Sequence, residues 1–241
     1  TTSFWTPRAC DSKAETRSRT DVRWSAVKGV FVRSWRAIIE MPNDLDPDLF
    51  LVSTASRYYA KGVAFAALGQ HAMAEQQVEL FETAVSKIPE TRRFFNNKAL
   101  DVLAIGREMM RGEMAYHRGN HNEAFAHLRQ AVWLNDNLFY TEPWAWMHPP
   151  RHALGALLLE HGHVEEAEAV YRADLGLDSS LSRPLQHPNN VWSLHGYVEC
   201  LERLGRNTEV DSIRLQLNLA LARADVEIKS SCFCRMDDCC D

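Results

Sequence analysis

Four glycines divide most of the chain into pairs of apolar segments with helical spacing. Gly69, Gly119, Gly162 and Gly205 each separate two such segments, and they follow one another at intervals of 50, 43 and 43 residues. In the stretch 140–174, apolar side chains recur every three or four residues on both sides of the central glycine. Glycine commonly ends a helix and lets the chain reverse direction. The sequence therefore predicts a series of helical hairpins.

Regular repetition of hairpins limits the folds that the chain can adopt. A hairpin with one apolar face cannot bury that face alone, so successive units stack into a solenoid. We therefore predict an all-α fold, an α-α superhelix of at least four hairpins without a sheet. The predicted units span about residues 51–89, 103–134, 140–174 and 189–222, with a further helical segment at 22–42.

The ends of the chain differ in composition from its middle. The first 20 residues are polar, and the last 13 are polar and rich in cysteine. We predict three parts: an extended or disordered arm at 1–20, a helical-repeat domain at 21–228 and a cysteine-rich tail at 229–241. Because the chain does not begin with Met, we expect it to be processed or truncated.

Composition excludes several classes of protein. The chain is 46% hydrophobic and 24% charged, which is enough for a large core, and it contains no run of 18 apolar residues that would predict a membrane span. A formal net charge of -5 argues against a general nucleic-acid binder. No apolar signal-peptide stretch opens the chain and its cysteines form no disulfide framework, so we expect a cytoplasmic protein.

The helical hairpins resemble tetratricopeptide repeats (TPRs), a family of 34-residue helix-turn-helix units. The resemblance covers about residues 51–222, although the 43-residue period leaves about nine additional residues in each connection. Another departure is Asp174, which stands where the family usually has alanine. The matching residues are Gly112, Ala115, Gly119, Ala124, Leu128 and Ala131 in the unit at 103–134, and Gly155, Gly162, Ala167 and Tyr171 in the unit at 140–174.

The resemblance implies a concave groove lined by the first helix of each unit. We expect His152, Trp192 and His195 to face the same cavity, because they occupy matching positions in successive units. Ionisable and aromatic groups there suit an amphipathic or basic peptide, or a metal. The alternative is that they only solvate the inner surface. The candidate groove residues are Tyr59, Met109, Glu113, His117, His152, Glu160, Trp192, His195, Glu199 and Arg203.

Four cysteines near the C-terminus form a second candidate site. Cys232, Cys234, Cys239 and Cys240 offer four thiolates within nine residues, enough for zinc or copper(I). Their spacing is not the two-residue knuckle of ordinary zinc sites, so a disulfide pair, a redox-active tail and a disordered end are the alternatives. If a metal is bound, the tail could fold back so that His152 and His195 complete its ligands.

These patterns support two functional hypotheses. The first is a scaffold that binds a partner peptide or protein segment in its groove. The alternative is a metal-binding protein or metalloenzyme that combines the C-terminal cysteines with groove histidines. The sequence has no GxSxG, GxxxxGK[ST] or GxGxxG motif and indicates no reaction. In the connection at 141–150, Trp144 and Trp146 are expected to pack locally against the helices.

Overall fold

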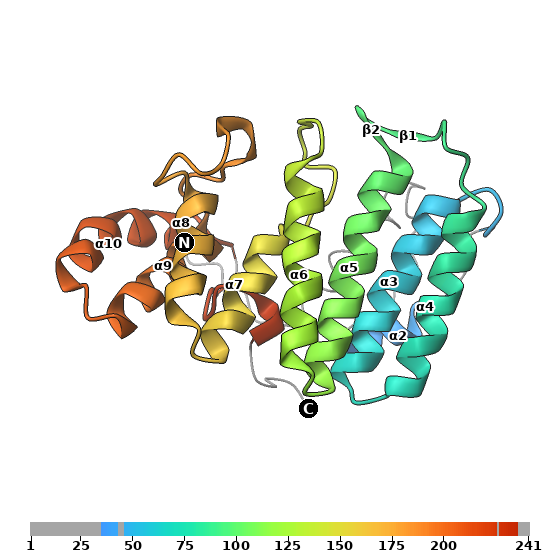
Figure 1. Ribbon diagram of the computed structural model, residues 1–241, viewed down its shortest axis with the longest axis horizontal. Coiled ribbons are helices and arrows are strands. Elements are labelled where there is room, and N and C mark those ends of the chain that lie inside the picture. The colour runs from blue at the N-terminus through green and yellow to red at the C-terminus, as the bar shows by residue number, and fades with distance from the viewer. Residues whose placement is uncertain (1–34, 43–45, 226, 236–241) are drawn as a thin grey trace, which may run out of the picture.

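The structure is a computed structural model that describes residues 35–42, 46–225 and 227–235. The predicted arm at 1–20, residues 22–34 of the first helical segment, Cys239 and Cys240 lie outside these ranges. Within them the chain forms a stack of helical hairpins (Figure 1). None of the helices in the described ranges is both long enough and apolar enough to cross a bilayer.

Four hairpins make up the stack, as the sequence predicts. A short helix, α2 (Trp35–Glu40), precedes them and buries Ile38 in the common core. Two single-turn helices, η1 (Arg183–Leu185) and η2 (Phe233–Arg235), lie outside the hairpins. The hairpins are α3 (Leu51–Ala67) with α4 (His71–Ser86), α5 (Ala99–His117) with α6 (His121–Asp136), α7 (Pro150–Glu160) with α8 (Val164–Leu175), and α9 (Val191–Arg203) with α10 (Asn207–Leu221).

One element was not predicted. Strands β1 (Arg93–Phe94) and β2 (Asn97–Lys98) pair antiparallel in the connection between α4 and α5. The prediction of a chain without any sheet is therefore wrong in this detail. The ladder has two residues on each side and belongs to a connection, so the fold remains all-α.

The turn glycines have the backbone conformation that their role in the repeat requires. Gly69, Gly119, Gly162 and Gly205 all have positive φ, between 69° and 82°, which residues with a Cβ atom rarely adopt. In every turn the amide of the next residue donates to a carbonyl five residues earlier, at 2.8–2.9 Å. This is the Schellman pattern, in which glycine ends a helix and reverses the chain. The four hairpins and their turns give the chain a TPR-like helical-repeat fold.

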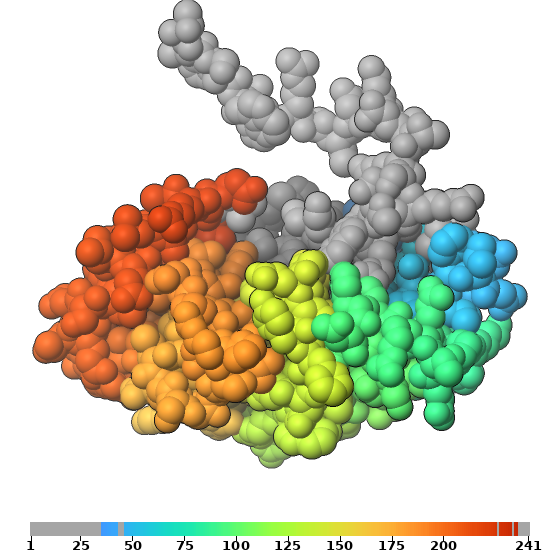
Figure 2. Space-filling view, turned by 90° about the horizontal axis from the view of Figure 1, so that it is seen from above, coloured from blue at the N-terminus to red at the C-terminus, as the bar shows by residue number. Residues whose placement is uncertain are grey.

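The helices form two layers. We call α3, α5, α7 and α9, the first helix of each hairpin, the inner helices, and α4, α6, α8 and α10 the outer helices. Among the inner helices, α3 packs against α5 and α7 against α9, and each connection brings an outer helix onto the next inner helix. Figure 2 shows the described chain as an arc that runs from α10 through α6 to α2.

The long connection at 137–149 packs onto the inner helices α3 and α5. Trp146 is only 7% exposed and meets Tyr59 of α3 edge-on, with the ring centroids 5.0 Å apart. Its indole N–H donates to Met109 Sδ at 3.0 Å, and its ring lies against Gly106, where a Cβ would come within 2.5 Å. The expected local packing is confirmed for Trp146, whereas Trp144 is 38% exposed.

Tyr171 crosses from the outer layer to the inner layer. Its ring lies between Gly155 of α7 and Gly196 of α9, and a Cβ at either glycine would approach the ring to 2.5 Å or less. The phenol hydroxyl reaches beyond both glycines and donates to Ser231 Oγ at 2.6 Å. Because both glycines lack a side chain, the Tyr171 ring fits between α7 and α9 and links both helices to α8.

We predict that Gly155→Leu lowers the free energy of unfolding by about 2–3 kcal/mol. Overpacking a close contact costs roughly 1–3 kcal/mol, and the Tyr171 ring cannot move aside because Gly196 confines its other side. Replacing glycine inside a helix recovers up to about 1 kcal/mol, which is less than the steric cost. Urea unfolding followed by circular dichroism measures the difference. Ala72→Leu, at an exposed position of α4, is the control and should change stability little.

Candidate functional site

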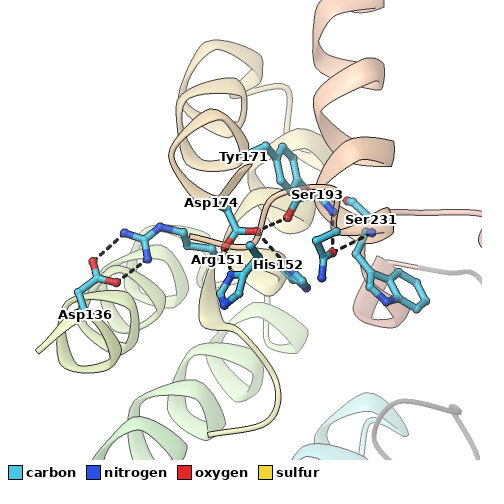
Figure 3. A network of polar contacts seen from close by, with 10 residues as sticks. Asp136, Arg151, His152, Tyr171, Asp174, Ser193 and Ser231 are labelled. Carbon is cyan, nitrogen blue, oxygen red and sulfur yellow. Dashed lines mark hydrogen bonds and ion pairs between the residues drawn. The ribbon is translucent and has the colours of Figure 1, made fainter. Parts of the chain in front are cut away.

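A buried carboxylate lies where the third and fourth hairpins meet (Figure 3). Asp174, at the end of α8, has no exposed surface. Its Oδ2 atom lies 3.2 Å from His152 Nε2 and accepts a hydrogen bond from Ser193 Oγ at 2.5 Å. Its Oδ1 atom lies 2.7 Å from His187 Nδ1. We call His152, Asp174, His187 and Ser193 the His–Asp cluster.

Each member of the His–Asp cluster comes from a different segment. His152 lies in the first turn of α7 and Ser193 in the first turn of α9, where the Asn190 side chain accepts hydrogen bonds from the amides of Trp192 and Ser193. His187 lies in the connection between α8 and α9, and its amide donates to the backbone carbonyl of Asp174 at 2.6 Å. Asp174 therefore fixes the connection through both its backbone and its side chain.

The environment keeps the carboxyl group of Asp174 ionised. Burial by itself raises its pKa, but hydrogen bonds and charge from His152 and His187 outweigh burial and hold the pKa well below its usual range. Arg151, the next residue in α7, pairs with Asp136 at 2.5 and 2.6 Å. The side chains that contact the Asp174 carboxylate are thus the two imidazoles and the Ser193 hydroxyl.

The geometry of the His–Asp cluster argues against a serine nucleophile and is compatible with metal binding. Ser193 donates to the carboxylate and not to an imidazole, so the cluster is not arranged like a Ser-His-Asp nucleophile. His152, Asp174 and His187 each offer one ligand atom, and these atoms lie within 4.8 Å of one another. Such a set of atoms could hold a metal ion.

An aromatic cleft adjoins the His–Asp cluster. The connections at 137–149 and 176–190 form its walls, and His187 is one of its lining residues. The Trp144 ring meets the His187 ring edge-on, with centroids 4.2 Å apart. Phe139 and Tyr140, also in the wall, are 72% and 50% exposed. The cleft therefore connects one imidazole of the cluster with the molecular surface.

A second polar region lies on the inner surface of α7 and α9, where residues 227–235 dock. We call these residues the C-terminal segment. Ser231, fully buried, accepts the hydrogen bond from Tyr171, and Cys232 Sγ lies 3.8 Å from His148 Nε2. Arg235 donates twice to Glu199 of α9, at 2.6 and 2.7 Å. The segment thus folds back onto the inner helices.

Several predicted groove residues surround this docked segment. Glu199 binds Arg235 directly, and the negative charge of Glu160 helps to raise the pKa of that guanidinium. Burial alone would raise the pKa of Glu199, but Arg235 and Arg203 outweigh burial and lower it. Of the remaining predicted residues on the inner helices, Trp192 and His195 are half-buried, whereas His117 is exposed at the end of α5.

Other predicted groove residues lie inside the protein and need correction. Tyr59, Met109 and Glu113 are at most 2% exposed, and Trp146 covers the first two. His152 is 4% exposed and lies in the His–Asp cluster, so the expectation that it shares a cavity with Trp192 and His195 is wrong. The physical reason is Asp174, a carboxylate at an alanine position that holds the imidazole between the layers.

Two of the C-terminal cysteines form a disulfide pair, one of the alternatives to a metal site. Cys232 and Cys234 form a disulfide, which leaves neither sulfur as a thiolate ligand. Because Cys239 and Cys240 lie outside the described residues, their part in a metal site stays a prediction. The segment does fold back, but its Cys232 sulfur lies near His148, and His195 is not among the three possible ligands at Asp174.

Sequence reasoning missed three members of the cluster. Asp174 gave a local signal, since it departs from the alanine of the repeat. His187 and Ser193 gave none, because a histidine in a connection and a serine at a helix start are common. Only the packing of α9 and its connection onto α8 brings the two side chains to the carboxylate.

Two solved structures resemble the chain in fold. Both show the nearly identical TPR-like repeats of a kinesin-light-chain-like protein from Podosopora anserina, and one is a single-substitution variant. Each is 18% identical with a TM-score of 0.47; the matches cover 85% and 86% of this chain and 94% and 97% of the other chains. No protein-family model matches the chain, and no curated protein matches it. The fold assignment rests on the hairpins and turns described above.

We predict that Glu113→Gln stabilises the protein more at pH 8 than at pH 5. Burial raises the pKa of Glu113 to about 7, and its Oε1 atom has no hydrogen-bond partner. Between the unfolded pKa, about 4.3, and the folded pKa, the folded state holds a proton that the unfolded state releases, so stability falls as pH rises. Glutamine removes this loss of stability, which is worth up to about 4 kcal/mol.

Urea unfolding of both proteins at pH 5 and pH 8 measures this effect. Glu90→Gln, at an exposed position, makes the same chemical change as a control. A Glu113→Gln variant whose stability difference from the parent is the same at both pH values would show that Glu113 does not hold a proton in the folded protein.

Proposed function

We propose that this protein is an interaction scaffold, and that its inner surface over α7 and α9 binds an extended segment of a partner protein. The observation that carries the proposal is the pair of hydrogen bonds between Arg235 and Glu199, by which the chain's own C-terminal segment docks on this surface. A TPR-like helical-repeat fold, with its wide inner surface, suits a protein-interaction role.

The contacts of the docked segment indicate what the surface recognises. The interaction between a guanidinium and a carboxylate that accepts two of its hydrogen bonds is strong and directional. The pair is shielded from water, since the Arg235 and Glu199 side chains are 16% and 22% exposed. The surface therefore favours a segment that presents an arginine.

Space on the inner surface adds a second requirement. A Cβ on Gly196 would lie 2.7 Å from Ser231 Cβ, so the segment passes very close to α9. A small residue is therefore needed about four positions before the arginine. We propose that a partner segment with this pattern takes the place of residues 227–235.

A fluorescent peptide of residues 227–235 tests the proposal with a chain that ends at residue 225. We expect saturable binding with one peptide per chain, because the surface is vacated while the four hairpins are kept. Glu199→Gln should weaken binding about tenfold or more, since it removes a charge-assisted pair worth roughly 1.5–3 kcal/mol. Fluorescence anisotropy gives the affinities, and circular dichroism checks that both chains are folded.

Glu202→Gln provides a matched control on the same helix. Glu202 is exposed and pairs with Arg214 of α10, away from the docked segment, so its loss should leave peptide affinity unchanged. A folded chain that does not bind the peptide, or that binds it equally well with Glu199→Gln, contradicts the proposal.

A further inference from the structure

We propose that His152, Asp174 and His187 form a binding site for one divalent transition metal ion of the zinc type. The inference is independent of the scaffold function, because the site lies between the helical layers and not on the surface that holds the C-terminal segment. It also differs from the ligand set suggested by the sequence, which combined His152 with His195 and the C-terminal cysteines.

The donor atoms suit such an ion in type and in position. Two imidazole nitrogens and one carboxylate oxygen are the donors of many zinc sites that keep a fourth position open. His152 Nε2 and His187 Nδ1 lie 3.2 and 2.7 Å from oxygens of Asp174, and the three ligand atoms lie within 4.8 Å of one another. Ligands about 2.0–2.1 Å from a tetrahedral ion are separated by similar distances, so small side-chain rotations are sufficient.

Charge also favours a cation at this point. Asp174 is completely buried, and a buried carboxylate is costly unless a positive charge compensates it. The nearby Arg151 guanidinium forms its ion pair with Asp136. A divalent ion bound by the carboxylate and two neutral imidazoles would supply the compensating charge. A proton shared with the imidazoles is the competing explanation, and the experiment below separates the two.

The surroundings hold the proposed ligands in place. Ser193 donates to the carboxylate, and the amide of His187 donates to the carbonyl of Asp174, so two ligand residues are fixed to each other. Hydrogen bonds to the ligand side chains are a regular feature of protein metal sites. The Trp144 ring also restricts His187 from the cleft side.

The aromatic cleft provides access to the site. His187 lines both the cleft and the cluster, so an ion can enter beside its ring. A water molecule or a small ligand that reaches the ion through the cleft would occupy the fourth position. This arrangement differs from a structural zinc site, in which four protein ligands close the coordination shell.

Metal analysis of the untagged full-length protein is the direct test. We expect about one zinc ion per chain after purification without chelators, its loss on dialysis against EDTA, and a rise in melting temperature when zinc is added back. Cobalt(II) added to the metal-free protein should give the visible absorption of a tetrahedral nitrogen- and oxygen-ligated ion. A parent protein that holds no zinc and whose melting temperature zinc does not change overturns the proposal.

Two conservative variants separate metal binding from hydrogen bonding. His187→Asn and His152→Gln keep an N–H group near the position of the bonded nitrogen but lose the imidazole lone pair. We expect each to weaken zinc binding about 100-fold or more. Even the loss of a residue that only hydrogen-bonds to a metal ligand typically lowers metal affinity 10–100-fold. Their melting temperatures in EDTA should stay close to that of the metal-free parent. Unchanged zinc affinity in both variants overturns the proposal.

Two further variants control for other ligands. His163→Asn removes an exposed histidine from the turn between α7 and α8 and should leave zinc binding unchanged. Replacing Cys232, Cys234, Cys239 and Cys240 by serine should also leave one zinc ion per chain. If the zinc is lost with these cysteines and retained in His187→Asn, the metal belongs to the C-terminal cysteines and the proposed site is wrong.

Discussion

The carboxylate of Asp174 holds together the half of the molecule that carries both candidate sites. Through His152 it joins α8 to α7, through Ser193 it joins α8 to α9, and through His187 it fixes the connection at 176–190. A hydrogen bond to a charged group typically contributes about 1.5–3 kcal/mol. The placement of the fourth hairpin on the third therefore depends in part on this buried carboxylate and its three partners.

Segments outside the hairpins cover parts of the inner helices. In a plain stack of hairpins the inner helices are open to solvent, but here Trp146 enters from the connection at 137–149 and covers Tyr59 and Met109. The C-terminal segment covers part of α7 and α9. The inner surface is thus occupied by the chain itself over both regions.

The helical framework could be predicted because its signals are local. Helical spacing of apolar residues and a glycine that needs positive φ are both properties of short segments, and they repeat with the hairpins. Matching positions in successive units also identified Glu160 and Glu199, which lie near Arg235 in the structure.

The candidate sites were harder to predict because they depend on contacts between distant segments. The 43-residue step placed His152 in the groove, but repeat register does not show that Asp174 will draw the imidazole between the layers. The same limit applies to Trp146, whose position depends on how the connection folds back onto α5. The departure of Asp174 from the usual alanine was the one local sign that this interface is unusual.

The position of Tyr171 has a consequence for selectivity at the inner surface. Its ring is fixed between Gly155 and Gly196, so the phenol hydroxyl cannot withdraw when the contacting chain changes. Ser231 provides the acceptor, and a chain that covers the hydroxyl without an acceptor leaves a buried polar group unpaired, at a cost of about 1–3 kcal/mol. That cost corresponds to roughly a 5- to 150-fold loss of affinity. Under the proposed function, a core residue of the outer layer would thereby discriminate among the partner segments that compete for the inner surface.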